Sequence, residues 1–400
     1  MMKVLIADSF AQGGIEELRR QGADVFYAPE LGGDSLVEAI RVREPGVLVV
    51  RSTSVTRPML EAGPLRLVVR AGAGFNTIDV EAASERGILV ANCPGKNSIA
   101  VAELTFGLIL AIDRRIPQNA ADLKQGIWNK KEYSNARGLF GRTLGIIGLG
   151  RIGLEVLARA QAFGMPVVAW SRSLTEQRAA ELGVRMASSP GEVASAADVV
   201  TVHLALTPET GRLLSADFFD AMRPSSTFIN TSRAGVVDEA ALVDAVRNRG
   251  IRAGLDVFAD EPEASTGRMA NEIFQLDGVI GTHHIGASTD QAQQAIAEET
   301  VRIICEYMDT CSVGNAVNLA KKTPATHLLV VTHHDRVGAL AGILDELRGA
   351  GINVEEMQNV VFEGAAAAMA RMQLSKALPN KVKKAITDSD SVIAVDSIRL

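Results

Sequence analysis

Cysteines and long hydrophobic runs are scarce in this 400-residue sequence. Its three cysteines, Cys93, Cys305 and Cys311, are too few and too irregularly spaced for a disulfide framework or a metal cluster. Acidic residues outnumber basic ones, 47 to 41, so the net charge is −6 and neither nucleic acid nor an anionic membrane is expected as the main partner. We therefore expect reduced thiols, no bound metal and a cytoplasmic protein.

The apolar runs are too short to form a signal-peptide core or a membrane-spanning helix. Asp8 ends the first run, Val4–Ala7, before it reaches the length of a signal-peptide core. The longest run, 98–112, includes Glu103 and falls short of the roughly 20 residues that span a bilayer. We expect a buried helix there, no targeting signal and no membrane-spanning segment.

Short β-rich runs alternate with helical stretches through the first three quarters of the chain. This alternation predicts an α/β fold with two doubly wound parallel sheets of the Rossmann or flavodoxin type. The first set of predicted strands is 3–8, 24–27, 47–51, 67–70 and 88–90. The second is 143–147, 167–171, 198–204, 227–230, 253–257 and 279–283.

The pattern changes after Asn318. A linker, 321–324, precedes segments that we interpret as strand, helix, strand, strand, helix and strand, beginning at His327. This is the element order of a ferredoxin-like α+β module.

A glycine triplet follows the first strand of the second set. Gly148, Gly150 and Gly153 have the spacing G-x-G-x-x-G, directly after a strand and at the head of a helix. This context predicts a dinucleotide site in which Arg151 and Ile152 begin the helix whose free N–H groups bind the pyrophosphate.

The next strand lacks the acidic residue that usually binds the ribose 2′-hydroxyl. Ser171 and Arg172 stand at its end instead. Ser171 can bond a hydroxyl, whereas Arg172 can pair with a 2′-phosphate, so the sequence is compatible with NAD and with NADP.

Three polar side chains follow strands of the second set: Arg233, Glu261 and His284. Ligands bind at strand ends of open α/β sheets, so we expect these residues to share one cleft. Histidine can take the hydroxyl proton during hydride removal, a carboxylate can fix its tautomer, and arginine can bind a carboxylate or polarise an oxo group. Asp256 is expected to accept a hydrogen bond from the nicotinamide amide.

Four motifs, 148–153, 230–242, 255–262 and 284–293, resemble those of the D-isomer-specific 2-hydroxyacid dehydrogenases, and the resemblance covers about residues 1–320. It implies that Arg233, Glu261 and His284 are catalytic, with His284 as the base in preference to its neighbour His283. It further implies a discontinuous substrate domain (1–97 and 286–320) around an NAD(P) domain (98–285). The other expected cofactor contacts are His203, Thr231 and Gly286.

Within the family, the chain is most similar to members that oxidise 3-phospho-D-glycerate to 3-phosphooxypyruvate in the first step of L-serine biosynthesis. This likeness assigns the phosphate to Arg51 and Ser52. It also implies a homodimer or homotetramer in which Lys130 reaches a neighbouring active site. The remaining substrate contacts that it implies are Ala73, Gly74 and Asn97.

Residues 325–400 resemble an ACT domain, which implies L-serine or another amino acid as a ligand. Asp335 and Val337 depart from the usual pattern, whereas Asn353 matches it, so an oligomerisation module is the alternative. Two other functions stay open for the whole chain: an NADP-dependent glyoxylate or hydroxypyruvate reductase, favoured by Ser171, and a non-enzymatic dinucleotide-sensing corepressor.

Overall fold

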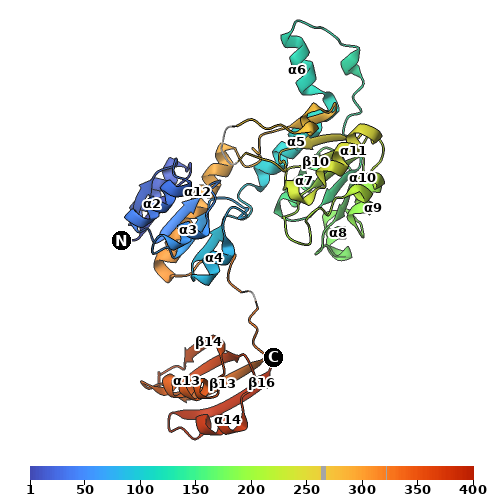
Figure 1. Ribbon diagram of the computed structural model, residues 1–400. Coiled ribbons are helices and arrows are strands. Elements are labelled where there is room, and N and C mark those ends of the chain that lie inside the picture. Colours follow the sequence, from blue (N-terminus) through green and yellow to red (C-terminus); the bar gives the residue numbers. More distant parts are fainter. Residues whose placement is uncertain (263–266, 321) are drawn as a thin grey trace. The chain divides into compact units, whose positions relative to one another are not determined.

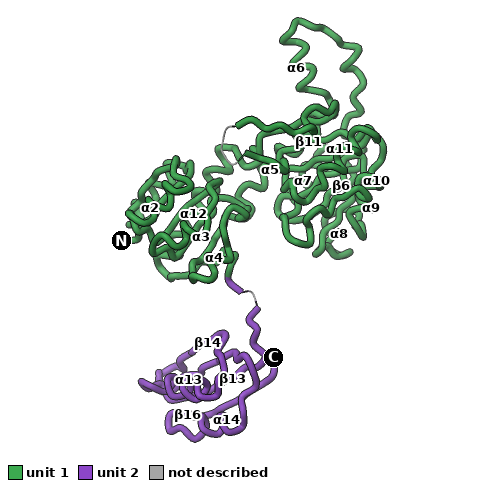
Figure 2. Tube along the Cα trace, in the orientation of Figure 1, with its two compact units in different colours: residues 1–318 green, residues 319–400 purple. Residues whose placement is uncertain are grey.

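The computed structural model describes residues 1–262, 267–320 and 322–400. The chain divides into two compact units, residues 1–318 and residues 319–400, which Figure 2 shows in green and purple. Both predicted parallel sheets lie in the first unit.

The first sheet is parallel throughout, in the order β2-β1-β3-β4-β5. Every residue of β3, with the sequence VLVV, is buried, as expected for a strand covered on both faces. Its strands are β1 (Lys3–Ile6), β2 (Asp24–Tyr27), β3 (Val47–Val50), β4 (Leu67–Arg70) and β5 (Leu89–Asn92), and its helices are α1 (Gln12–Arg20), α2 (Gly33–Arg43), α3 (Arg57–Glu61) and α4 (Val80–Glu85).

The second sheet is also parallel, in the order β12-β11-β10-β9-β6-β7-β8. The prediction missed its edge strand β8, whose residues are both exposed and carry no apolar periodicity. The strands are β6 (Leu144–Ile147), β7 (Val167–Trp170), β8 (Arg185–Met186), β9 (Val199–Val202), β10 (Thr227–Asn230), β11 (Arg252–Leu255) and β12 (Val279–Gly281). The helices are α5 (Ser98–Arg114), α7 (Arg151–Ala162), α8 (Glu176–Leu182), α9 (Pro190–Ala196), α10 (Ala216–Ala221) and α11 (Glu239–Arg249), with short 3-10 turns η2 (Ala234–Val236) and η3 (Glu272–Gln275).

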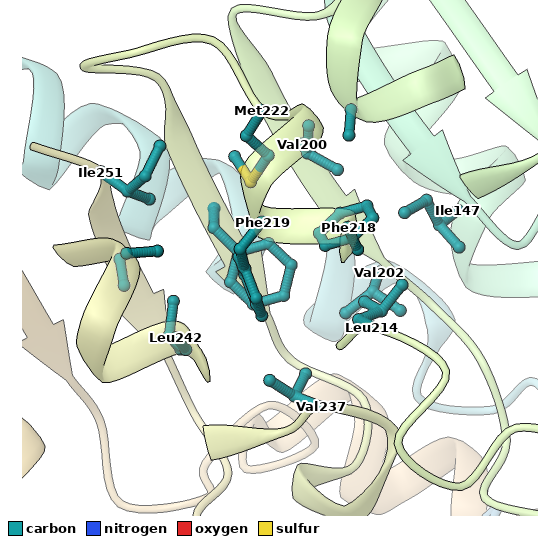
Figure 3. Close-up of a cluster of buried hydrophobic side chains, with 14 of the residues drawn as sticks. Ile147, Val200, Val202, Leu214, Phe218, Phe219, Met222, Val237, Leu242 and Ile251 are labelled. Carbon is teal, nitrogen blue, oxygen red and sulfur yellow. The ribbon is translucent and has the colours of Figure 1, made fainter. Parts of the chain in front are cut away.

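Aromatic packing fixes one face of this second sheet (Figure 3). The rings of Phe218 and Phe219 on α10 meet edge to face, with centroids 5.1 Å apart, and Phe219 packs in the same way on Phe228 of β10. Burial of each ring contributes about 1.5–3 kcal/mol to stability. The cluster holds β9 and β10 rigidly, and the loops at their ends carry candidate site residues.

Two helices differ from the layers around them. α12 (Asp290–Thr310) lies far along the chain, yet Ile296, Val301 and Ile304 pack into the core of the first sheet. α6 (Ile116–Lys124) has no buried residue, and Figure 1 shows it standing away from the second sheet, followed by η1 (Glu132–Ser134). α6 and η1 form an exposed arm, residues 116–138.

The second unit has the predicted ferredoxin-like order. Its antiparallel sheet has the order β14-β15-β13-β16, and Ile343 and Leu347 of one helix lie in its core. The elements are β13 (His327–His334), α13 (Ala339–Gly349), β14 (Val354–Val361), β15 (Ala367–Leu374), α14 (Asn380–Thr387) and β16 (Val392–Arg399). Across the part of the chain that the structure describes, no helix is long and apolar enough to cross a membrane.

Candidate active site

The turn between β6 and α7 has the shape that a dinucleotide pyrophosphate requires. Gly148 has a φ of +99°, and a side chain there would come within 2.5 Å of the carbonyl oxygen of His203. A side chain on Gly153 would overlap the carbonyl oxygen of Gly148. Nothing, in contrast, lies within 4 Å of the place where a side chain of Gly150 would stand. This open side between two tightly packed glycines fits a phosphate that approaches the backbone.

The N-terminus of α7 provides the donors for that phosphate. Gly150, the N-cap, has no side chain with which to cap the first amides of this 12-residue helix. Arg151 directs its guanidinium to the carbonyl oxygen of Pro94, and Ile152 packs against the apolar core. Both residues are therefore placed to offer backbone amides, while their side chains are used elsewhere.

Two other predicted cofactor residues, His203 and Thr231, are buried at strand ends. Nε2 of His203 lies 3.0 Å from the hydroxyl of Thr201, and its Nδ1 has no hydrogen-bond partner among the described residues. Burial lowers the pKa of His203 to about 3, so the ring is neutral. The hydroxyl of Thr231 lies 3.0 Å from that of Thr105 on α5. Their role toward a dinucleotide stays a prediction.

His284 and Glu261 form a hydrogen-bonded pair. Nδ1 of His284 lies 2.7 Å from Oε2 of Glu261, and Oε1 accepts the amide of Phe258 at 2.9 Å. Burial raises the pKa of Glu261, but the bonds from His284 and Phe258 outweigh this effect and leave it below the usual 4.5. The ionised carboxylate keeps a proton on Nδ1, so Nε2 is free to accept one. His283 is exposed and lacks such a bond among the residues described, which favours His284 as the base.

Arg233 completes the predicted set. One of its guanidinium nitrogens donates to the carbonyl oxygen of Ser232 at 2.7 Å. Burial lowers its pKa and the nearby Glu261 opposes this shift, but arginine remains charged. Arg233, Glu261 and His284 all line one cavity of about 560 Å³. The structure thus brings the three predicted catalytic residues together.

Asp256 holds the loop that carries His284. Its carboxylate is 1% exposed and accepts three hydrogen bonds: from the hydroxyl of Thr282 at 2.6 Å, from the amide of Ile285 at 2.9 Å and from the amide of Gly286 at 2.8 Å. Between these anchors His284 has a φ of +51°, a backbone conformation that non-glycine residues adopt rarely. The observed role of Asp256 and Gly286 is to fix this turn, and the contact of Asp256 with the nicotinamide stays a prediction.

Arginines meet at the end of the first sheet as well. Burial, together with the positive charges of Arg233 and Arg51, lowers the pKa of Arg70 to about 10. We call Arg51, Arg70 and Arg233 the arginine cluster. Arg70 was not among the predicted site residues, although it ends a predicted strand just as Arg233 follows one. Three adjacent cations favour an anionic ligand.

The backbone at residues 51–53 is not free to bind that anion. One carboxylate oxygen of Asp8 accepts the amides of Arg51, Ser52 and Thr53, at 2.6, 3.1 and 3.0 Å. The phosphate that the resemblance assigns to Arg51 and Ser52 therefore cannot be bound by their amides, which already donate to Asp8. Any phosphate contact has to come from the Arg51 guanidinium and the Ser52 hydroxyl.

The remaining predicted substrate residues are divided between the sheet and the arm. A side chain on Gly74 would overlap the guanidinium of Arg233, so glycine lets these two segments meet. The carbonyl oxygen of Ala73 accepts the side-chain amide of Asn92 at 2.6 Å. Asn97 caps α5, and its side-chain oxygen is buried without a hydrogen-bond partner in the described chain. Lys130 lies on the exposed arm, away from these groups.

The glycine turn, the His284–Glu261 pair and the adjacent arginines together define a dehydrogenase-type site on a Rossmann sheet. Residues 106–286 match the family model described as D-isomer specific 2-hydroxyacid dehydrogenase, NAD binding domain. The chain belongs to the D-isomer specific 2-hydroxyacid dehydrogenase family.

Curated relatives of the chain include several proteins named D-3-phosphoglycerate dehydrogenase. A D-3-phosphoglycerate dehydrogenase of Methanocaldococcus jannaschii is 41% identical over 76% of this chain, and one of Bacillus subtilis is 33% identical over 97%. The chain spans 58% and 72% of these two proteins, respectively, and 57–64% of the other curated relatives compared with it. The crystal structure of the TT0316 protein from Thermus thermophilus superposes with a TM-score of 0.71, at 32% identity, over 79% of this chain and all of that one.

Proposed function

We propose that this chain is a D-3-phosphoglycerate dehydrogenase, which oxidises 3-phospho-D-glycerate to 3-phosphooxypyruvate in the first step of L-serine biosynthesis. The arginine cluster beside the His284–Glu261 pair is the observation that carries this proposal. The substrate has a carboxylate and a phosphate of about −1.5 to −2 charges, which three guanidinium groups can neutralise. The named relatives support the same reaction.

In this mechanism His284 is the general base. Its Nε2 takes the proton of the 2-hydroxyl group, and Glu261 stabilises the imidazolium that results. Arg233 binds the substrate carboxylate or polarises the developing oxo group. A dinucleotide held by the glycine turn and the first amides of α7 would supply the hydride acceptor for C2. In the reverse direction His284 returns its proton to the oxo oxygen.

We further propose that residues 1–97 and 286–320 bind the acid, while residues 98–285 bind NAD(P). The chemistry of the two strand-end regions supports this division: the first has Arg51 and Arg70, and the second has the glycine turn. The open side of Gly150 provides the place for the pyrophosphate.

The exposed arm supports a homodimer or homotetramer. Trp128 is 80% exposed, and Ile116 and Leu123 are each more than half exposed, an unusual set of apolar side chains for one short arm. Burial of the arm against a second copy would cover them and carry the adjacent Lys130 toward a neighbouring acid-binding site.

Residues 325–400 are proposed as an ACT-like regulatory module. Their ferredoxin-like sheet order supports the fold, and Asn353 stands at the start of β14 with its side-chain amide donated to Glu355 at 2.9 Å. Binding of L-serine or another amino acid and a purely oligomeric role are the two alternatives for this module.

A substrate panel tests the proposed reaction. Purified protein is assayed with 3-phosphoglycerate, glycerate, lactate and 2-hydroxyglutarate, each with NAD and NADP, while absorbance follows the reduced dinucleotide. We expect a strong preference for the phosphorylated acid. Equal rates with glycerate would contradict the proposal and leave the family assignment untouched.

A second candidate is an NADP-dependent glyoxylate or hydroxypyruvate reductase. Ser171 and Arg172 at the end of β7 favour it, since NADP usually serves reductions. Assays of the reverse reaction, with glyoxylate, hydroxypyruvate and 3-phosphooxypyruvate as substrates, distinguish this reductase from the phosphoglycerate dehydrogenase. Dinucleotide binding without turnover of any acid would instead indicate a sensor or corepressor.

A further inference from the structure

A second cavity adjoins the glycine turn. It has a volume of about 220 Å³ and lies where β7 ends, against α7 and α8. Four of its lining residues are leucines, and the other three are polar donors. The lining comprises Leu149, Leu154, Leu174, Leu182, Ser171, Ser173 and Arg178. Since Leu149 belongs to the glycine turn, this cavity continues the pyrophosphate site, with an apolar surface suited to an adenine ring and a polar rim at the ribose.

No carboxylate lines this cavity in the described chain. Glu181, which is near, is exposed and pairs with Arg178 at 3.0 Å. A ribose with a free 2′-hydroxyl is best bound by a carboxylate that accepts its hydrogen bonds, whereas a 2′-phosphate requires donors. Ser171, Ser173 and Arg178 all provide donors, so the rim is better suited to a phosphate.

Arg172 adds a second positive charge beside the rim. This residue is exposed and makes no ion pair within the described ranges. The hydroxyl of Thr207 and the backbone amide of Glu209 lower the pKa of Glu209, and Arg172 adds a smaller effect, which places its charge near the loop after β9. The Glu209 carboxylate accepts the Thr207 hydroxyl at 2.7 Å, and no ion pair joins it to Arg172 among the described residues.

We propose that this site selects 2′-phosphorylated dinucleotides, with the phosphate bound by Arg172, Arg178 and the hydroxyls of Ser171 and Ser173. The inference deepens the proposed function, because it names the cofactor class of the same dinucleotide site. It predicts NADP in preference to NAD, although the matched family model is described only as an NAD binding domain.

Nucleotide binding alone tests the proposal, without any acid substrate. The full chain is titrated by calorimetry with 2′-phospho-ADP-ribose and with ADP-ribose, two compounds that lack the nicotinamide. We expect the phosphorylated compound to bind at least about tenfold more tightly, with a steeper dependence on salt. Equal or tighter binding of ADP-ribose would overturn the inference. The outcome is independent of which acid is oxidised, so it distinguishes failure here from failure of the proposed reaction.

Substitutions in the polar rim of the cavity test whether its side chains cause the preference for the 2′-phosphate. Arg172→Ala and Arg178→Ala are each expected to weaken 2′-phospho-ADP-ribose about tenfold while ADP-ribose changes less than twofold. Ser171→Asp is expected to reverse the preference, because it restores the acceptor for a hydroxyl and repels a phosphate. Arg185→Ala is the matched control: Arg185 pairs with Glu192 at 3.1 Å and is 55% exposed, against 3.0 Å and 53% for Arg178. If the two rim arginines behave like this control, the rim does not bind the phosphate.

Discussion

The two parallel sheets use the backbone amides at their strand ends differently. After β6, nothing in the described chain lies within 4 Å of a side chain built at Gly150, and the first amides of α7 have no side-chain cap there. After β3, the amides of Arg51, Ser52 and Thr53 are all donated to the carboxylate of Asp8. The first arrangement leaves an anion site for a ligand, whereas the second fills such a site with a side chain of the protein itself.

This difference indicates how each sheet can bind its proposed ligand, a dinucleotide at the second sheet and an anionic acid at the first. The second sheet can bind a dinucleotide through its backbone, and it also carries the His284–Glu261 pair. If the first sheet binds an anionic acid, as proposed, it does so through side chains, chiefly Arg51 and Arg70. Changes in the second sheet should therefore alter turnover or dinucleotide affinity, and changes in the first sheet should alter the KM for the acid.

His284→Asn should give the largest effect. Loss of the general base is expected to lower kcat about 1,000-fold, while dinucleotide affinity, measured by fluorescence titration, stays unchanged. His283→Asn, one position away and exposed, is the control and should retain most of the activity. Loss of dinucleotide binding in His284→Asn would contradict the role assigned to this imidazole.

Gly153→Ala tests the open turn of the second sheet. The added methyl group would overlap the carbonyl oxygen of Gly148, so the turn must move, and dinucleotide affinity should fall about 100-fold. Gly107→Ala is the control, because nothing lies within 4 Å of a side chain at that position of α5. An unchanged dissociation constant in Gly153→Ala would show that the turn is not the pyrophosphate site.

Glu261→Gln should lower kcat about 10- to 100-fold, since a neutral amide fixes the tautomer less well and does not stabilise the imidazolium. The pKa of Glu261 lies below 4.5, so in the unchanged protein this carboxylate is ionised above about pH 5 and loses its charge only as the pH falls through that lowered value. The change in kcat that accompanies this loss of charge should therefore be absent in the variant, whose side chain does not titrate. Glu272→Gln, on the surface and paired with Arg247, is the control. A profile identical to that of the unchanged protein would exclude electrostatic support by Glu261.

Local sequence signals predicted much of this architecture. β2, β4 and β10 have the predicted bounds, because apolar runs flanked by Gly, Pro or Asp mark the ends of buried strands. The three predicted catalytic residues were found in the same way, since strand ends of one parallel sheet lie along one edge. Their shared cavity was expected on the same ground, whereas the turn of Asp256, Ile285 and Gly286 that positions His284 beside Glu261 was not predictable.

The contact between Asp8 and residues 51–53 shows why the rest was missed. It depends on β1 and β3 being neighbours, although β2 lies between them in the sequence. Strand order is a property of the whole sheet, and no local sequence pattern predicts it. Arg70 is different: its strand-end position was visible, and applying the strand-end criterion to the first sheet would have identified it.

Arg51→Ala tests side-chain binding at the first sheet. We expect the KM for 3-phosphoglycerate to rise about 10- to 30-fold with little change in kcat, because one charge-assisted phosphate contact is lost. Unphosphorylated acids should be much less affected. Arg57→Ala is the control, since Arg57 is exposed and pairs with Glu85 at 2.7 Å. An equal rise in KM for glycerate would remove the phosphate role from Arg51.

Substitution of Asp8 should have the smallest effect on catalysis. Two variants, Asp8→Ala and Asp8→Asn, distinguish a role in positioning Arg51 from a contribution to stability. Asn at position 8 can still accept the three amides through its neutral side-chain oxygen, whereas Ala cannot. We expect Asp8→Ala to raise the KM for 3-phosphoglycerate about fivefold, with kcat and dinucleotide affinity unchanged, and Asp8→Asn to restore most of the loss.

Inorganic phosphate gives a second measurement on the same variants. In Asp8→Ala the amides of residues 51–53 become free, so phosphate should inhibit this variant more strongly than it inhibits the unchanged protein or Asp8→Asn. If Asp8→Ala instead loses thermal stability without any change in KM or in phosphate inhibition, the carboxylate serves only the fold. In that case the hydrogen bonds between Asp8 and the amides of residues 51–53 would not be needed to position Arg51 for substrate binding.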